Sequence, residues 1–519
     1  MPLQLYNTLP AEVEEFAPSV DNTVRMYSCG PTVYDYGHIG NFRTFVAVDI
    51  LRRFLRQSGF KLDHVMNITD VDDKIIRRVQ EDRVPLRQLT GQYESAFLED
   101  LKALHCLEPH HKPRATEHIP EIVLLIEKLL ARGLAYKAAD GSIYFSIEKY
   151  RAAGGVYGRL VQLNSDALRP GERVRSDEYA KESAADFALW KARSAEDGDI
   201  FWPGPFGEGR PGWHIECSAM SMKILGAAFE LHVGGEDLIF PHHEDEIAQS
   251  EGATGKPFVK YWLHGAHLLV EGRKMSKSLG NFFTLRDLVA RGFTGREIRY
   301  LLLSAHYRET FNFTLEGLNG AKAALARLDE CMGKLRALAP GPGTPASASA
   351  SAFAKASADR TADKTADKTA DRCAGADGSG HRPPLQGTDA AAQRPYPSDY
   401  NALALQRFSD ALDEDLNVSA AWGVVFEWVG ELNRRLARSQ LAPGDAAAAL
   451  TTWEKIVSVL GVGTAPGAEV PAQISALVQA REAARKEKNF KRADEIRGDL
   501  ASKGWAVEDS ANGPKLKRR

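Results

Sequence analysis

The sequence is short of cysteine, of long apolar runs and of any excess of charge, and each shortage excludes a class of protein. The five cysteines, Cys29, Cys106, Cys217, Cys331 and Cys373, are odd in number and widely scattered. They therefore favour reduced thiols over a disulfide framework. No apolar run approaches the ~20 residues of a membrane span, and the N-terminus has neither the basic nor the apolar region of a signal peptide. The sequence thus predicts a cytoplasmic protein.

Charge gives no global sign of nucleic-acid binding. The 66 Lys and Arg residues face 69 Asp and Glu residues, for a formal net charge of −3. Any contact with RNA must therefore rely on local basic patches. A length of 519 residues allows roughly two to four domains and a large buried core.

The stretch from Ser28 to Asn41, SCGPTVYDYGHIGN, joins a predicted strand to a predicted helix. Thr23 to Cys29 alternates as a strand does, Gly30 and Pro31 end it, and the apolar spacing after Gly40 is typical of an amphipathic helix. A helix N-terminus presents unpaired N–H groups and partial positive charge. This segment therefore predicts a seat for a nucleotide phosphate.

Lys61 to Met66 predicts a second strand, and Asp70, Asp72 and Asp73 follow it before another helix. Strand, helix, strand is the start of a parallel sheet, in which ligands bind beyond the carboxyl ends of the strands. The aspartates are therefore either part of a ligand site or N-caps of the helix.

A low-complexity segment interrupts the second half of the chain. Residues 340–398 are rich in Ala, Pro, Ser, Thr, Asp and Gly, and Ser357 to Arg372 is a tetrapeptide repeat, SADR-TADK-TADK-TADR. Such a segment has too few large apolar side chains to offset its chain entropy. It predicts a mobile linker with Cys373 as an exposed thiol.

Two short motifs carry a family resemblance. GHIGN at residues 37–41 and KMSKS at residues 274–278 resemble the HIGH and KMSKS signatures of class I aminoacyl-tRNA synthetases, with Asn41 as the last letter of the first. CGPTVYDYGHIGN, NITDVDDKI, PGWHIECSAM and GGEDLIFPHHEDE resemble the corresponding stretches of cysteinyl-tRNA synthetases. The resemblance covers most of residues 1–320 and, more loosely, residues 400–510.

The resemblance implies an α/β fold: a Rossmann-like parallel-sheet catalytic domain with an insertion, then a mainly α-helical bundle and a small C-terminal domain. The expected segments are 1–135 and 201–290 for the two halves of the catalytic domain, 136–200 for the connective insertion, 291–339 and 399–463 for the helical bundle, 340–398 for the low-complexity insertion, and 464–519 for anticodon recognition. The basic end, KLKRR, is expected to contact RNA.

The resemblance also implies a zinc site. Spacing alone shows only that His242 and Glu246 lie at i and i+4, on one face of a helix opened by Pro241. On that geometry His243 or Glu244 could replace them. The resemblance selects a ligand set of two thiolates, an imidazole and a carboxylate, which suits Zn²⁺: Cys29, Cys217, His242 and Glu246.

The implied reaction is ATP-dependent ligation of L-cysteine to its tRNA through a cysteinyl-adenylate, with zinc selecting the substrate thiolate. Mg²⁺ would arrive with ATP, and positioning and charge neutralisation carry such phosphoryl chemistry. The catalytic residues implied are His38, Asn41, Lys274 and Lys277. Further ATP contacts fall on Gly37, Gly40 and Ser276, and the amino-acid pocket on Thr69, Trp213 and His232.

Three other functions are weighed against this one. A ligase that passes cysteine to a small amine resembles the catalytic core alone, so residues 400–519 argue against it. The intact GHIGN and KMSKS motifs argue against a non-catalytic tRNA-binding relative. A zinc hydrolase is disfavoured because protein residues fill all four metal positions, which leaves no dedicated position for a water molecule. The partners expected are therefore tRNA for cysteine, ATP and L-cysteine, with no membrane, and the protein is expected to be a monomer.

Deleting residues 342–395 should leave aminoacylation within a few-fold of the full chain and the melting temperature nearly unchanged, because the segment lacks the side chains of a core. Charging assays and calorimetry on the deleted chain test this. A large loss of activity or a collapsed fold would show that the segment is structured or functional.

Overall fold

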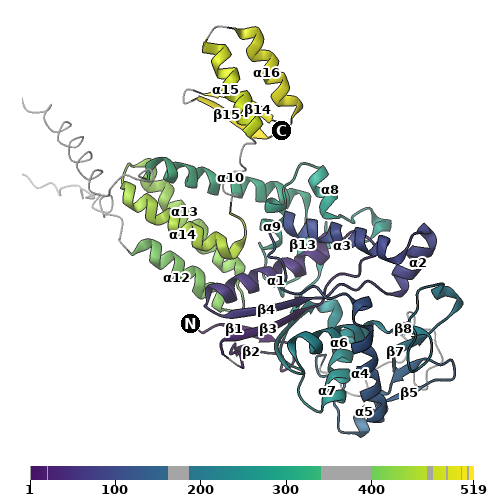
Figure 1. Cartoon of the computed structure of the whole chain (residues 1–519). Coiled ribbons are helices and arrows are strands. Elements are labelled where there is room, and N and C mark those ends of the chain that lie inside the picture. Colours follow the sequence, from purple (N-terminus) through teal and green to yellow (C-terminus); the bar gives the residue numbers. More distant parts are fainter. Residues whose placement is uncertain are drawn as a thin grey trace, which may run out of the picture. The chain divides into compact units, whose positions relative to one another are not determined.

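The computed structural model describes residues 2–19, 21–161, 186–339, 399–463, 472–486, 489–503, 505–510 and 513–518. The chain forms two compact units, residues 1–462 and 463–519 (Figure 1). The predicted linker, with Cys373, lies outside the described residues. Within the described part of the chain, no helix is both long and apolar enough to cross a membrane.

A four-stranded parallel sheet in the order β10-β9-β3-β4 organises the first unit. Its register aligns Tyr27, His232 and Trp262 in one row across three strands. The sheet confirms the predicted α/β fold and the two strands expected first. The strands are β3 (Thr23–Ser28), β4 (Lys61–Met66), β9 (Phe229–Gly235) and β10 (Val259–Gly265).

Successive side chains of β3 are buried on opposite faces of the sheet, as the two-residue period of a strand requires. Val24 and Met26 belong to the apolar cluster that contains the inner face of α1 (Ile39–Gln57). Tyr27 belongs to a second cluster, which includes residues of α6 (Trp213–Leu225). In Figure 1, α1 and α6 accordingly lie on opposite sides of the sheet.

The expected insertion, with the residues that flank it, forms a four-stranded antiparallel sheet in the order β5-β6-β7-β8, whose last strand lies beyond the expected end at residue 200. Its apolar cluster also contains residues of α6 and α7, so the insertion packs on the helices that carry predicted ligands. Its elements, with the helices beside it, are α4 (Ile119–Ala131), β5 (Ala135–Lys137), β6 (Ile143–Phe145), α5 (Ile147–Ala152), β7 (Phe187–Ala192), β8 (Gly209–Pro211) and α7 (Glu244–Thr254).

Pro241 lies in a π-helical segment, Ile239–His243, that runs directly into α7 at Glu244. Phe240 interrupts this segment with an extended backbone (φ −146°, ψ 124°), so the helical residues that lead into α7 follow it, in agreement with the prediction that Pro241 opens a helix. The backbone of His243 is already helical (φ −69°, ψ −32°). His242 and Glu246 therefore still lie one turn apart, as the i, i+4 argument requires.

The remaining elements complete the two units. The N-terminal hairpin pairs β1 with β2, a small sheet has the order β12-β11-β13, and the second unit contains a β14–β15 hairpin that the sequence analysis did not anticipate. They are β1 (Gln4–Asn7), β2 (Glu12–Glu15), α2 (Asp73–Asp82), α3 (Leu86–Ala103), β11 (Leu268–Val270), β12 (Arg273–Lys274), α8 (Leu285–Ala290), α9 (Gly295–Leu302), β13 (Phe311–Phe313), α10 (Leu315–Leu338), α12 (Tyr400–Asp413), α13 (Val418–Ala437), α14 (Pro443–Leu460), α15 (Ala472–Lys486), α16 (Phe490–Ser502), β14 (Trp505–Ser510) and β15 (Gly513–Arg518).

A buried ion pair joins helix α1 to the helical bundle. Asp49 of α1 lies 2.6 Å from Arg299 of α9, and both are buried. Arg299 also donates to the carbonyl of Leu460 at the end of α14 (2.6 Å), while Asp49 accepts from Arg53 (2.7 Å). The position of α1 is thereby tied to two helices far away in the sequence.

Asp49→Asn should lower the free energy of unfolding by about 3–5 kcal/mol, because it leaves the buried Arg299 charge uncompensated. Asp82→Asn, which breaks an exposed pair with Arg78, should cost less than about 1 kcal/mol. Urea unfolding of both variants measures the difference, and equal losses would contradict the argument.

The same pair predicts a pH dependence. Burial opposes ionisation of Asp49, but Arg299 and Arg53 hold its pKa below the ordinary value. A depressed folded-state pKa means that the stabilisation is complete above the unfolded-state pKa and is lost as the pH falls through the folded-state pKa. Asp49→Asn should therefore flatten the acid limb of the stability curve.

Candidate active site

The four predicted ligands converge at the carboxyl end of the parallel sheet. Cys29 follows β3, Cys217 lies in α6, His242 precedes α7, and Glu246 lies in the first turn of α7. One ligand atom from each lies within 4.8 Å of the other three. Cys29 is partly exposed as a residue, and the other three are buried.

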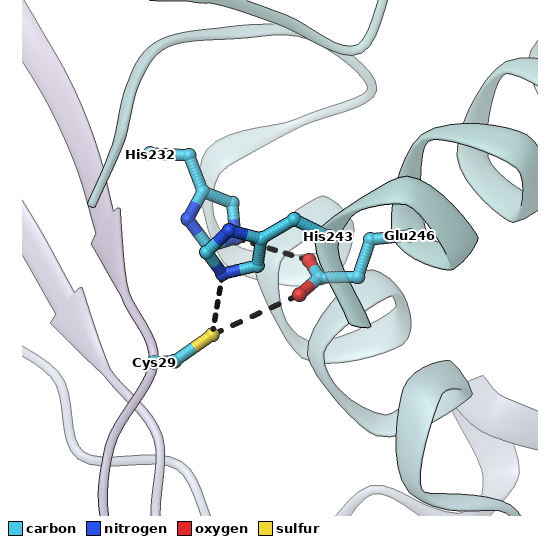
Figure 2. Close-up of side chains that lie close together, drawn as sticks. All are labelled: Cys29, His232, His243 and Glu246. Atoms are coloured by element: carbon cyan, nitrogen blue, oxygen red, sulfur yellow. Dashed lines mark hydrogen bonds and ion pairs between the residues drawn. The ribbon is translucent and has the colours of Figure 1, made fainter. Parts of the chain in front are cut away.

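A second set of four residues also meets the spacing of a metal site. It keeps Cys29 and Glu246 but replaces the other two with His232 and His243 (Figure 2). The spacing argument left His243 open as a ligand, and the structure leaves it open too. Glu244 is different, because its buried carboxylate accepts from the backbone N–H groups of residues 158–160 at 2.7–3.1 Å and is fully engaged there.

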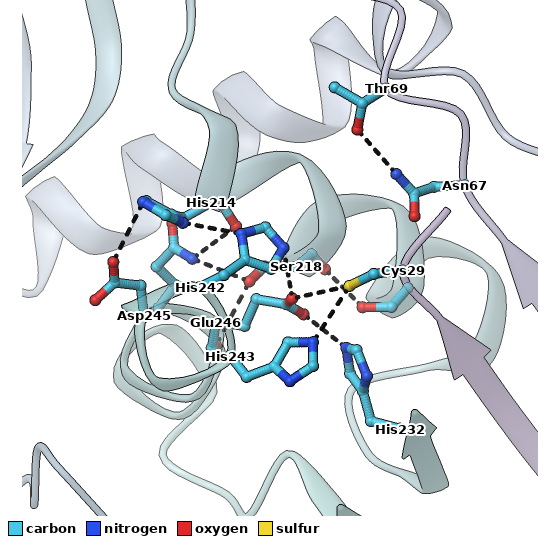
Figure 3. Close-up of polar contacts among 12 residues, drawn as sticks. Cys29, Asn67, Thr69, His214, Ser218, His232, His242, His243, Asp245 and Glu246 are labelled. Carbon is cyan, nitrogen blue, oxygen red and sulfur yellow. Dashed lines mark hydrogen bonds and ion pairs between the residues drawn. The ribbon is translucent and has the colours of Figure 1, made fainter. Parts of the chain in front are cut away.

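Three of the four predicted ligands have a histidine directly behind them (Figure 3). Such outer partners fix the orientation and the tautomer of metal ligands. The contacts are Cys29 Sγ to His243 Nε2 at 3.3 Å, Glu246 Oε2 to His232 Nε2 at 3.0 Å, and His242 Nδ1 to His214 Nδ1 at 2.9 Å.

The charges of the cluster favour a cation. A hydrogen bond with Cys29 lowers the pKa of Cys217 to about 6 despite burial. Burial opposes protonation of His242, but contacts with Cys217 and Glu246 raise its pKa to about 10. Burial also opposes ionisation of Glu246, but His232 and His242 lower its pKa to about 2. A thiolate and a carboxylate thus surround one protonated imidazole, an arrangement in which a divalent ion can replace the proton.

The residues predicted for the amino-acid pocket border the cluster in different ways. Trp213 is 37% exposed, and the centroid of its ring lies 4.3 Å from that of the His242 ring. Thr69 is buried beside the turn after Cys29, and its hydroxyl accepts from Asn67 at 3.1 Å. His232 is fully buried, with its ring stacked on Trp262, and its Nε2 bonds to Glu246.

The GHIGN motif forms the N-terminus of α1, as predicted. His38 is the N-cap: its Nδ1 accepts from the Asn41 backbone N–H at 3.2 Å, and Asn41 Oδ1 accepts from the His38 N–H at 3.1 Å. Because Nδ1 is an acceptor, the neutral imidazole carries its proton on Nε2. His38 is therefore prepared to donate from Nε2.

The two signature motifs lie side by side. A Cβ added to Gly40 would lie 3.2 Å from Met275 Cε and 3.0 Å from His38 Nδ1, so glycine is needed for this close approach. Lys274 is exposed, whereas the side chain of Lys277 is outside the described part of the structure. Gly37 also faces a tight contact, since a Cβ there would lie 2.9 Å from the Phe42 ring.

Asn281 holds the KMSKS loop, a role that the sequence analysis did not assign. Its Oδ1 accepts from the Ser276 N–H at 2.9 Å, and its Nδ2 donates to the carbonyls of Val270 and Lys274 at 3.3 and 3.2 Å. The Ser276 hydroxyl meets that of Ser278 at 2.8 Å. Asn281 thus ties the loop to β11 and β12.

The three aspartates after β4 have structural partners. Asp72 is the N-cap of α2, as one of the two interpretations held, and accepts from the Lys74 N–H at 2.7 Å. Asp73 pairs with Lys191 at 2.8 Å and with Arg210. Asp70 accepts from the Thr116 hydroxyl at 2.6 Å.

Two histidines behind the ligands were missed, His214 and His264. His214 lies in the quoted stretch PGWHIECSAM, and His264 lies near the carboxyl end of β10. Contacts between segments far apart in the chain bring them to the cluster, and neither the packing of α6 nor the strand order could be obtained from periodicity.

Three family models match the chain. Residues 15–323 match the class I (C) tRNA synthetase catalytic domain, residues 407–464 the DALR domain, and residues 467–513 the cysteinyl-tRNA ligase anticodon binding domain. Together they extend over both units. The recognition made from the four quoted stretches is confirmed.

Curated relatives are similar in sequence to this chain over its full length. A cysteine–tRNA ligase of Chlamydia abortus is 44% identical over 99% of this chain and 98% of its own, and one of Solibacter usitatus is 44% identical over all of both chains. Among solved structures, methionyl-tRNA synthetase of Mycobacterium tuberculosis with methionyl-adenylate has a TM-score of 0.52 at 15% identity, covering 85% of this chain and 90% of that one. A putative arginyl-tRNA synthetase of Campylobacter jejuni has a TM-score of 0.51 at 12% identity, covering 86% and 93%. These two likenesses show the fold alone, whereas the sequence matches show that the chain belongs to the cysteine–tRNA ligase family of class I aminoacyl-tRNA synthetases.

Proposed function

We propose that the chain attaches L-cysteine to its tRNA in two steps. The cysteine carboxylate attacks the α-phosphorus of ATP, giving cysteinyl-adenylate and pyrophosphate, and a ribose hydroxyl of the tRNA terminal adenosine then takes the acyl group. The observation that carries the proposal is the position of the Cys29–Cys217–His242–Glu246 cluster at the same sheet edge as the paired GHIGN and KMSKS motifs. One edge of the parallel sheet thus combines a site that would bind a substrate thiolate with a site that would bind a nucleotide.

The donor set fits zinc. Two thiols, an imidazole and a carboxylate converge within bonding range of one ion, and the charges of Cys217 and Glu246 favour a cation. A zinc ion held by these four residues would supply a soft Lewis acid that prefers a thiolate to a hydroxyl. Shape alone separates such near-isosteres by only ~1–3 kcal/mol. The site thereby accounts for rejection of serine without a separate editing domain.

The chain's own residues position ATP. His38 Nε2–H and the Asn41 side chain are placed at the N-terminus of α1, where the phosphates of ATP with Mg²⁺ would bind. Lys274 and Lys277 neutralise charge that develops on the β- and γ-phosphates, with Ser276 on the same loop. Gly37 and Gly40 admit the nucleoside. Thr69 and Trp213 flank the amino acid, and His232 orients Glu246 behind it.

The second unit supports tRNA as the acceptor. The anticodon-binding model falls on residues 467–513, which a ligase using a small amine would not need. We place the protein in the cytoplasm, acting as a monomer. The small-amine ligase remains the second candidate, because activation of cysteine alone requires only the first unit.

The function is tested by ATP–pyrophosphate exchange with a panel of amino acids. Exchange should depend on cysteine and not respond to serine, and the full chain should charge tRNA. A chain truncated after Val462, which lacks the second unit, should retain measurable exchange but charge tRNA poorly. Exchange supported by another amino acid, or undiminished charging by the truncated chain, would contradict the proposal.

Cys217→Ser should lower zinc content and cysteine affinity together, by more than the ~10–100-fold typical of an outer partner, with ATP affinity much less affected. His243→Gln is the matched variant, because it removes a ligand of the alternative set but keeps a side-chain N–H. Metal analysis and equilibrium binding of both variants measure the effect. If His243→Gln loses zinc and Cys217→Ser retains it, the ion is held by the alternative set of ligands instead.

A further inference from the structure

A row of three buried side chains runs from the N-terminal hairpin to the ligand Cys29. Thr8 Oγ1 lies 2.7 Å from His264 Nδ1, His264 Nε2 lies 2.7 Å from His243 Nδ1, and His243 Nε2 lies 3.3 Å from Cys29 Sγ. The exposed fractions are 8% for Thr8, 6% for His264 and 0% for His243. The row uses both nitrogens of both rings.

The backbone places Thr8 for this contact. Asn7 extends the edge of the sheet with its side chain: Nδ2 donates to the Lys260 carbonyl at 3.0 Å, and Oδ1 accepts from the Trp262 N–H at 2.9 Å. The Thr8 N–H then donates to the Trp262 carbonyl at 2.8 Å. These three hydrogen bonds hold Thr8 against β10 at Trp262, two residues before His264.

The hydrogen bonds in the row have one consistent direction when Cys29 is a metal ligand. A metal-bound sulfur carries no proton, so Cys29 Sγ can only accept, and His243 Nε2 must be the donor. A neutral imidazole has one donor and one acceptor, so His243 Nδ1 accepts from His264 Nε2–H. Burial lowers the pKa of His264 to about 3, which keeps that ring neutral. Its Nδ1 therefore accepts, and the Thr8 hydroxyl supplies the proton.

We infer that Thr8 is a positioning residue of the metal centre: its hydroxyl fixes the tautomers of His264 and His243 so that His243 donates an N–H to Cys29 Sγ. The inference rests on the proposed metal at Cys29. The N–H bond draws electron density from the thiolate, which leaves the bound ion a stronger acceptor for the sulfur of the substrate. A residue of the N-terminal hairpin thus acts on the centre through two rings.

Thr8→Val tests this, because valine keeps the shape of threonine but can neither donate nor accept. Zinc affinity, measured by chelator competition, should fall about 10-fold, at the low end for an outer partner. In the Co²⁺-substituted protein the sulfur-to-metal charge-transfer band should move to lower energy. Thr8→Ser should match the wild type in both measurements. Thr90→Val is the control, since it removes a buried hydroxyl bonded to the Leu86 carbonyl at 3.0 Å, far along the chain in α3.

A rescue variant distinguishes an effect through the hydrogen bonds of the row from an effect of altered packing at position 8. The amide of His264→Gln donates toward His243 without help from position 8, so Thr8→Val combined with His264→Gln should regain the zinc affinity and the band position of the wild type. The double variant also provides the test if Thr8→Val alone does not fold. Thr8→Val behaving like Thr90→Val in affinity and spectrum, or no recovery in the double variant, would overturn the inference. A wild-type chain that takes up neither Zn²⁺ nor Co²⁺ would instead overturn the proposed function on which it rests.

Discussion

The structure depends on gathering buried charge at one edge of the parallel sheet. Glu246 is fully buried and accepts from His232 on one oxygen, while His242 lies 3.1 Å from the other. An isolated carboxylate there would cost several kcal/mol, so the surrounding elements must supply positive partners. Strand β9, the turn before α7, and α7 itself are therefore fixed relative to one another by the same carboxylate.

The rest of the site is built around that constraint. Glu244, two residues before Glu246, binds the backbone of residues 158–160 and so fastens the insertion to the first turn of α7. On the opposite face of the sheet, the Asp49–Arg299 pair fixes α1, whose N-terminus meets the KMSKS loop at Gly40. The four-residue cluster and the paired signature motifs are thus held by separate buried polar contacts on one sheet. Under the proposed function, a substrate that spans both would be aligned by the sheet itself, and such positioning lowers the barrier of phosphoryl chemistry.

Much of this could be predicted from the sequence. Thr23–Cys29 and Lys61–Met66 correctly predicted the strands β3 and β4, and Gly40, predicted to open the first helix, is the second residue of α1. The four metal positions came from the family resemblance, since no spacing rule connects Cys29 with Cys217. The structure brings them together only because β3 and α6 pack across the sheet, a contact between residues far apart in the chain.

What the sequence could not supply was the layer behind the ligands. Thr8, His214 and His264 have no pattern of their own, and their roles appear only when strand order sets their neighbours. By contrast, the start of the helical run that carries His242 and Glu246 was predictable, because proline is a good first helical residue and the extended backbone of Phe240 lies directly before Pro241. Residues 340–398 remain a prediction, as they lie outside the described part of the chain.

The central claim is that the ion held by Cys29, Cys217, His242 and Glu246 binds the sulfur of the substrate. X-ray absorption at the zinc edge tests it most directly, with selenocysteine used in place of cysteine so that the substrate atom differs from the two protein sulfurs. The account predicts that a zinc–selenium shell appears on saturation while the signal from the protein ligands persists. A spectrum unchanged by saturating selenocysteine would remove the metal from amino-acid recognition and contradict the account.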